Sequence, residues 1–214
     1  MFKDREEAGR KLAEALEKYK GLKNAVVVAL PRGGVVLGRI VADALGAPLD
    51  LVVPRKIGAP FNEEYAIGAL AESGEAVWNE EERARCDAEA LRTIVAKERQ
   101  EAGRRLSVYR KGLPPRDLKG KTVILVDDGV ATGYTMRAAI NTVKAGKPEK
   151  IVVAVPVGPK DTLGELKREA DEVVILHTPV LFFAIGGFYE AFPQVEDEAV
   201  IELMKKELPS RQPL

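Results

Sequence analysis

Short apolar runs divide this chain, and segments with helical spacing separate most of them. The runs are rich in valine, which predicts strands buried within a sheet. Buried strands that alternate with helices form parallel sheets. The pattern therefore predicts an α/β fold with a doubly wound, mainly parallel sheet. The strands are expected at 25–30, 49–53, 122–126, 151–155 and 172–176.

The helices are predicted from apolar residues that recur on one face of a helical turn. They are expected at 3–19, from the turn at 31–34 to about residue 45, at 134–145, at 161–169 and at 196–207.

The middle of the chain has a looser pattern. Residues 65–70 and 75–78 flank Ser73-Gly74 and are predicted to pair as a hairpin. The densely charged stretch 80–106 has few helix breakers and is predicted to form one long solvated helix.

At 214 residues the chain is long enough for one substantial core, and residues 1–214 are expected to form a single domain. The core is expected to cover about 24–176. A hood over one edge of the sheet is expected from 1–23, 177–214 and an insertion at 57–110.

The composition limits the kinds of partner and the cellular location that are expected. The 33 basic and 33 acidic residues balance, so no global field draws the chain to nucleic acid or to a membrane surface, and neither is expected as a partner. No run approaches the roughly 18–20 apolar residues of a membrane span. The charged N-terminus lacks the apolar core of a signal peptide, and a lone cysteine, Cys86, excludes an internal disulfide. A cytoplasmic location is therefore expected.

Candidate chemistry follows the strand at 122–126, where Asp127 and Asp128 precede a loop of small and hydroxyl residues. Carboxylates accept hydrogen bonds from sugar hydroxyls. Loop amides and the hydroxyls of Thr132 and Thr135 can donate to a phosphate at a helix N-terminus. Because ligands of open parallel sheets bind beyond the carboxyl ends of the strands, the sequence predicts a sugar-phosphate site here.

Residues 123–136 resemble the phosphoribosyl pyrophosphate (PRPP) motif of the type I phosphoribosyltransferases. That motif has four apolar residues, two acids, two mostly apolar residues, a variable residue and Thr-Gly-x-Thr. Here it reads Val-Ile-Leu-Val, Asp-Asp, Gly-Val, Ala, Thr-Gly-Tyr-Thr. The resemblance implies that Asp127 and Asp128 hold the ribose 2′- and 3′-hydroxyls, directly or through Mg²⁺, and that residues 131–135 wrap the 5′-phosphate. The substrate-binding loop would comprise Gly129, Val130, Ala131, Thr132, Gly133, Tyr134 and Thr135.

Two positions depart from the family pattern. The position of Gly129 is usually bulkier. Ala131 stands where members that use 6-oxopurines usually carry Asp, which argues against hypoxanthine or guanine as the acceptor. Adenine-like bases, pyrimidines and other acceptors stay open. The chain lacks the Gly-rich signatures of P-loop ATPases and of dinucleotide-binding folds.

A second loop, Pro31-Arg32-Gly33-Gly34, follows the first strand and resembles the family's pyrophosphate loop. Arg32 offers a planar fork for phosphate oxygens, and the glycines let amides approach an anion. The alternative is a tight turn with an exposed arginine.

Arg55-Lys56 resembles the basic pair that the family places beside pyrophosphate. Lys56 is the candidate for neutralising the leaving group, and a solvated lysine is the alternative. The segment from Gly58 to Tyr65 resembles the start of a loop that closes over the reacting centre.

The aromatic segment 181–192 is expected to lie in the hood, where family members bind the base. Phe182, Phe183, Phe188 and Tyr189 are candidates for stacking on it, and packing in the core or at a dimer contact is the alternative.

The resemblance implies Mg²⁺-dependent transfer of phosphoribose from PRPP to a nitrogen nucleophile, usually a nucleobase, with release of pyrophosphate. Arg32, Lys56, Asp127 and Asp128 are the expected catalytic residues. A PRPP-binding regulator without catalysis and a PRPP hydrolase are the alternatives. By analogy with the family, a homodimer is expected.

Overall fold

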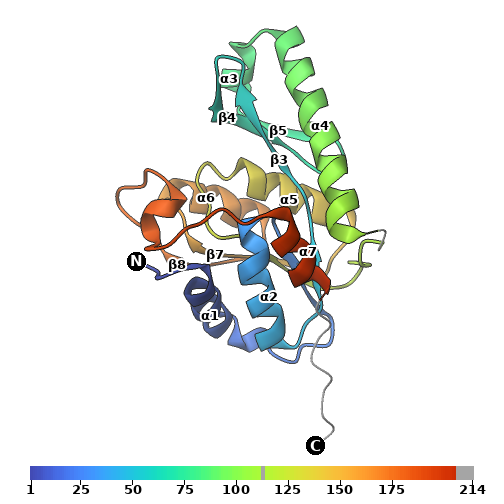
Figure 1. Ribbon diagram of the computed structural model, residues 1–214, viewed down its shortest axis with the longest axis vertical. Coiled ribbons are helices and arrows are strands. Elements are labelled where there is room, and N and C mark those ends of the chain that lie inside the picture. Colours follow the sequence, from blue (N-terminus) through green and yellow to red (C-terminus); the bar gives the residue numbers. More distant parts are fainter. Residues whose placement is uncertain (112–113, 206–214) are drawn as a thin grey trace, which may run out of the picture.

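The structure is a computed structural model that describes residues 1–111 and 114–205. Its centre is a parallel five-stranded sheet, which confirms the predicted α/β class (Figure 1). The strand order is β2-β1-β6-β7-β8. Their bounds are β1 (Ala25–Ala29), β2 (Leu49–Leu51), β6 (Thr122–Val126), β7 (Lys150–Val157) and β8 (Glu172–His177).

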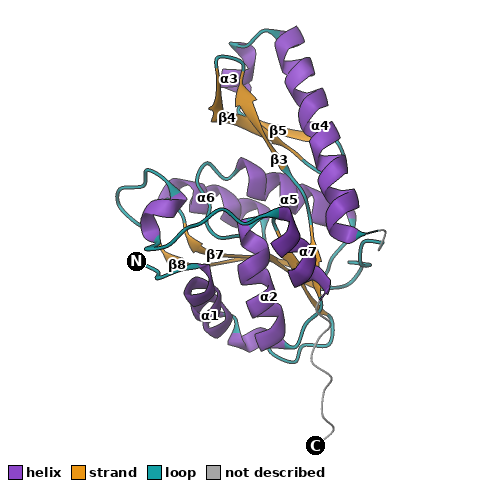
Figure 2. Ribbon diagram, viewed as in Figure 1, coloured by secondary structure: helices purple, strands orange, loops and turns teal. Residues whose placement is uncertain are grey.

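Helices cover both faces of this sheet, as a doubly wound fold requires (Figure 2). Strand side chains point alternately to the two faces. Val27 and Ile124 join one core with the helices α1 and α2, whereas Val28 and Leu125 join a second core with α5 and α6. The helices are α1 (Arg5–Ala15), α2 (Gly33–Leu45), α5 (Tyr134–Ala145) and α6 (Lys160–Glu169). The short helix η1 (Glu17–Tyr19) follows α1.

The middle of the chain forms an arm that projects at the top of Figure 1. The predicted hairpin is present, with Gly74 in its turn at φ +89°. A third strand, which the sequence pattern did not reveal, extends it to an antiparallel sheet. The arm comprises β3 (Arg55–Ala59), β4 (Asn62–Leu70), β5 (Ala76–Trp78), α3 (Glu80–Ala84) and α4 (Ala88–Arg110).

The prediction of one continuous helix at 80–106 is wrong. The chain leaves the helical path after α3, and Asp87 begins a new helix by accepting hydrogen bonds from the amides of Glu89 and Ala90. Such N-caps stabilise a helix start by about 1 kcal/mol. The second helix, α4, then continues to Arg110, beyond the predicted end.

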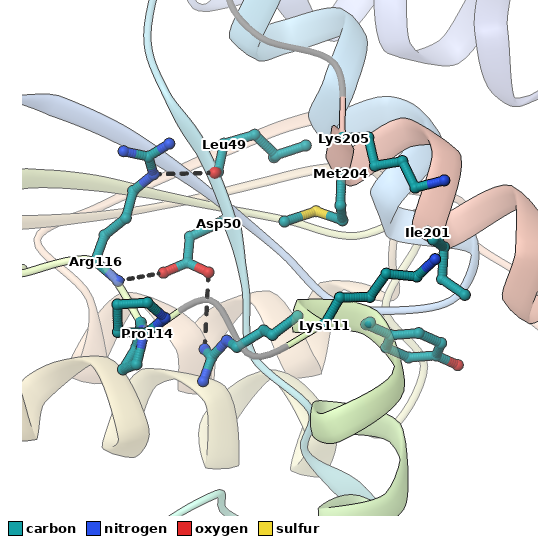
Figure 3. A pocket seen from close by; sticks show the side chains of 11 residues that line it. Leu49, Asp50, Lys111, Pro114, Arg116, Ile201, Met204 and Lys205 are labelled. Carbon is teal, nitrogen blue, oxygen red and sulfur yellow. Dashed lines mark hydrogen bonds and ion pairs between the residues drawn. The ribbon is translucent and has the colours of Figure 1, made fainter.

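Salt bridges fix the base of the arm to the edge of the central sheet (Figure 3). Arg110, the last residue of α4, donates to the carbonyl oxygen of Leu51 at 2.8 Å and pairs with Glu72 at 3.0 Å. Asp50 lies 3.7 Å from Arg110 and accepts from the amide of Arg116 at 2.8 Å. Asp50, Arg110 and Arg116 border a cavity of about 360 Å³, which residues of the last helix, α7 (Asp197–Lys205), also line.

Both ends of the described chain pack against other elements: the N-terminus against the aromatic segment, and α7 against α2 and α4. The N-terminus pairs with the aromatic segment: Phe2 donates to the carbonyl of Phe188, and Glu190 donates to that of Phe2, each at 2.8 Å. The short helix η2 (Ile185–Phe188) and helix α7 (Asp197–Lys205) complete this region. Residues 206–207 of the predicted last helix lie outside the described residues.

Candidate functional site

The two loops singled out by the sequence leave the sheet side by side. They follow β1 and β6, which are neighbours, and the amide of Leu30 donates to the carbonyl of Val126 at 3.0 Å. From β1 the chain passes through α2 to β2 on one side, and from β6 it passes through α5 to β7 on the other. This is the topological switch point, where open α/β sheets bind ligands.

Glycines allow the two loops to touch. A Cβ atom on Gly33 would lie 1.8 Å from Oδ2 of Asp128, and one on Gly34 would lie 2.8 Å from Oδ1 of Asp127. Either atom is closer than van der Waals contact permits. From the sequence, these glycines were expected to let amides approach an anion; the structure adds that the acid pair itself lies close to them. The peptide bond between Pro31 and Arg32, at the start of this loop, is cis.

The two acids have different partners. Oδ1 of Asp127 accepts from the amide of Asp128 at 2.8 Å. Oδ2 of Asp128 accepts from Nε of Arg5 at 2.7 Å, and the hydroxyl of Tyr189 donates to the Asp128 carbonyl at 2.6 Å. Sequence reasoning missed Arg5, because a charged residue at the start of an amphipathic helix usually lies in solvent.

Burial raises the pKa of both acids, and Arg5 opposes the shift at Asp128. Loss of hydration raises the pKa of Asp127 well above its usual value, and the charge of Asp128 raises it further. Burial also raises the pKa of Asp128, but the neighbouring Arg5 guanidinium opposes this shift. The Arg5 guanidinium therefore favours the charged form of Asp128.

The loop after the acids leads into an uncapped helix. Gly133 stands at the N-cap position of α5 with φ +81°, and no side chain among the described residues caps this helix or α2. The hydroxyl of Thr162 anchors the loop by donating to the carbonyl of Ala131 at 2.6 Å. Thr132 is exposed and Thr135 is half-buried. Free amides at a helix N-terminus attract anions.

The two predicted cations both have carboxylate partners. Arg32 lies 3.6 Å from Glu196 and 3.7 Å from Asp197, so it links the first loop to the start of α7. Lys56 lies on β3 in the arm and pairs with the exposed Glu64 at 2.9 Å. Its approach to the two loops stays a prediction. Closure of the 58–65 segment also stays a prediction; here the segment comprises the end of β3, the turn at residues 60–61 and the start of β4.

The aromatic candidates divide into two kinds. Phe183 is 92% exposed, and Phe188 stacks on Phe182 with ring centroids 5.3 Å apart. Tyr189 is buried between Phe2 and Phe192. In this structure Tyr189 therefore packs beneath the site, and Phe183 is the ring most available for stacking.

A family model described as a phosphoribosyl transferase domain matches residues 2–186. The chain belongs to the phosphoribosyl transferase family. A Mycobacterium tuberculosis protein with a provisional phosphoribosyl transferase name is 42% identical over 208 residues, 96% of this chain and 47% of that protein. This chain thus spans about half the length of that curated relative. The bifunctional protein PyrR of Leifsonia xyli is 29% identical over 145 residues, 67% of this chain and 63% of that protein.

A solved structure of the same size supports the fold. The crystal structure of TT1426 from Thermus thermophilus is 44% identical and has a TM-score of 0.78. The likeness covers 95% of this chain and 97% of that one. It therefore extends over both the central sheet and the arm.

One departure from the phosphoribosyl transferase motif has a packing reason. A Cβ atom on Gly129 would lie 2.6 Å from Cγ2 of Ile185, a residue of η2. Ile185 therefore fills the space that a larger side chain at this position would need.

The acid pair suits a magnesium ion carried by a phosphorylated substrate. The described part of the chain holds no cluster of three or more His, Cys, Asp or Glu side chains that could bind a metal alone. Mg²⁺ is usually bound by one or two carboxylates together with substrate phosphates and water. Asp127 and Asp128 match that donor set.

Within residues 1–111 and 114–205, no helix combines the length and apolar character needed to cross a bilayer.

Proposed function

We propose that this chain transfers phosphoribose from PRPP to a nitrogen nucleophile, with release of pyrophosphate. The supporting observation is the junction of the first loop and the acid pair at the switch point, where the uncapped helices α2 and α5 begin. Two anion-binding helix starts flank two carboxylates, which matches a sugar with phosphate groups at both ends.

Each part of PRPP has a matching group. The carboxylates of Asp127 and Asp128 accept hydrogen bonds from the ribose hydroxyls. The 5′-phosphate binds at the start of α5, where Thr132 and Thr135 add hydroxyl donors. Holding the sugar at both positions fixes C1 for attack.

Departure of pyrophosphate leaves positive charge on the sugar, as in other glycosidic chemistry. Arg32 and Lys56 neutralise the leaving group after exchanging their present carboxylate partners for phosphate oxygens. A bound Mg²⁺ would supply further neutralisation of the pyrophosphate. The site residues hold and orient the substrate, and no covalent enzyme intermediate is needed.

The acceptor is a nucleobase that stacks on the hood. The exposed ring of Phe183 and the half-buried ring of Phe188 are the candidates for stacking, and Ala131 provides no carboxylate for a purine proton. Adenine-like and pyrimidine bases are therefore preferred over 6-oxopurines. By analogy with the family, we expect the chain to act in the cytoplasm as a homodimer.

The test is an assay of pyrophosphate release. The protein is incubated with Mg²⁺, PRPP and one of adenine, hypoxanthine, guanine, uracil or orotate. Release that depends on the base supports the transferase, whereas release without a base supports a hydrolase. PRPP binding without turnover would support a regulator. Failure to bind PRPP at all would refute the proposal and both alternatives.

A further inference from the structure

Arg5 connects regions that are far apart in the sequence. Its Nε donates to Asp128 at 2.7 Å, and its Nη1 donates to the carbonyl of Pro193 at 2.6 Å. Its guanidinium carbon lies 3.6 Å from the ring centroid of Phe192. The side chain is 10% exposed, and its bond to Asp128 is partly buried. Arg5 therefore ties the start of α1, the hood and the acid pair together.

Arg5 also touches the pyrophosphate-loop candidate. A Cβ atom on Gly33 would lie 2.8 Å from Nε of Arg5 and 1.8 Å from Oδ2 of Asp128. The first loop thus closes over the same ion pair. A shift of Arg5 would break its contacts with Asp128 and with residues 192–193, and would also remove a side chain that lies against the first loop.

We infer that Arg5 is a positioning residue for the sugar: by holding one oxygen of Asp128, it sets the carboxylate in the orientation that accepts a ribose hydroxyl. This inference rests on the proposed PRPP site. A carboxylate has about four acceptor positions, so the bond to Arg5 leaves capacity for the substrate. Tyr189 restrains the same residue through its backbone carbonyl.

The chemistry of these contacts requires arginine. A planar guanidinium stacks on Phe192 with its face while its edge donates to Asp128 and to Pro193. A lysine ammonium supplies the charge but not a flat face with donors fixed in its plane. Charge and orientation can therefore be separated by substitution.

The experiment compares two ligands that share a phosphate and a five-membered ring. Ribose 5-phosphate carries ring hydroxyls, and tetrahydrofurfuryl phosphate carries none. Their dissociation constants are measured by calorimetry for the intact chain and for Arg5→Met, Arg5→Lys and Arg10→Met. Arg10 lies on the same helix, is exposed and pairs with Glu6 at 3.6 Å, so it is the matched control. Thermal unfolding checks that each variant is folded.

We expect the unaltered chain and Arg10→Met to prefer ribose 5-phosphate. Arg5→Met should bind ribose 5-phosphate about tenfold more weakly, because the loss of an oriented charged hydrogen bond costs roughly this much. Its affinity for tetrahydrofurfuryl phosphate should not change. Arg5→Lys should recover part of the preference.

Two results would overturn the inference. If Arg5→Met weakens the binding of both ligands by the same factor, Arg5 does not act through the sugar hydroxyls. The same conclusion follows if it weakens the binding of neither ligand. If the unaltered chain fails to distinguish the ligands, the sugar site itself is wrong, and the role of Arg5 falls with the proposed function. The two failures are therefore distinguishable.

Discussion

The hydroxyl of Tyr109 donates to a carboxylate oxygen of Asp197 at 2.6 Å. Tyr109 lies near the end of α4 in the arm, and Asp197 begins α7. Asp197 also lies 3.7 Å from Arg32, the arginine of the first loop. This bond therefore connects the arm, the helix α7 and the candidate pyrophosphate loop.

Tyr109→Phe tests this connection. The tyrosine stays neutral, because burial raises its pKa to about 12. Loss of the hydrogen bond from its hydroxyl should lower the free energy of unfolding at neutral pH by about 1 kcal/mol. The hydrogen bond from Tyr109 is the main cause that lowers the pKa of Asp197, so this stabilisation is present above the unfolded pKa and is lost as the pH falls.

Urea unfolding of both proteins at neutral pH and at about pH 3 checks this expectation. The difference between them should shrink at acid pH. An equal difference at both pH values would show that the contribution of the Tyr109 hydroxyl does not depend on the charge of Asp197.

Gly33→Ala should disrupt the acid pair. The added Cβ would lie 1.8 Å from Oδ2 of Asp128 and 2.8 Å from Nε of Arg5, so the first loop or Asp128 must move. We expect a loss of about 1–3 kcal/mol in unfolding free energy, typical of overpacking, and weaker PRPP binding. Gly103→Ala is the control, because a Cβ there meets nothing within 4 Å. Equal unfolding midpoints for the two variants would contradict the close approach.

Replacing both acids tests the sugar site. Asp127→Asn with Asp128→Asn removes the carboxylates but retains their size, so the chain should stay folded. PRPP binding, measured by calorimetry with Mg²⁺, should fall below detection. The exposed Glu81→Gln serves as the control for a lost acid. Unaltered affinity in the double variant would refute the assignment of these residues to ribose.

A cluster of charged side chains away from the site predicts how the stability of the chain changes at acid pH. Glu172 contacts Lys18 at 2.6 Å, Tyr19 at 2.6 Å and Lys150 at 2.9 Å. Burial is the largest influence and opposes ionisation, but the three hydrogen bonds together lower the pKa of Glu172 from 4.5 to about 2. The stabilisation is therefore complete above the unfolded pKa and is lost as the pH falls through that interval.

Glu172→Gln should cost about 1 kcal/mol at neutral pH, since partial exposure screens the charges. The variant should lose less stability than the unaltered chain on acidification. Denaturant unfolding at a series of pH values measures this. Parallel pH profiles for the two proteins would show that the pKa of Glu172 is the same in the folded and the unfolded chain.

The central sheet was predictable because its signals are local. Continuous apolar runs such as 122–126 have few alternatives to a buried strand, and the order of strands and helices then restricts the topology. β3 was missed because it begins with Arg55-Lys56 and depends on pairing with β4. The break at Asp87 was missed because an N-cap is hard to distinguish within a dense run of charges.

By itself, the sequence determined the fold class and the two loops that carry the candidate chemistry, since strand burial, tight turns and helix starts depend on neighbouring residues. Only the tertiary structure decided the partners of those loops. Arg5 and Asp128 lie 123 residues apart, and Ile185 fills the space beside Gly129. The burial of Tyr189, whose hydroxyl donates to the carbonyl of Asp128, also depends on tertiary packing. Such contacts arise from the packing of whole elements, and no spacing along the chain encodes them.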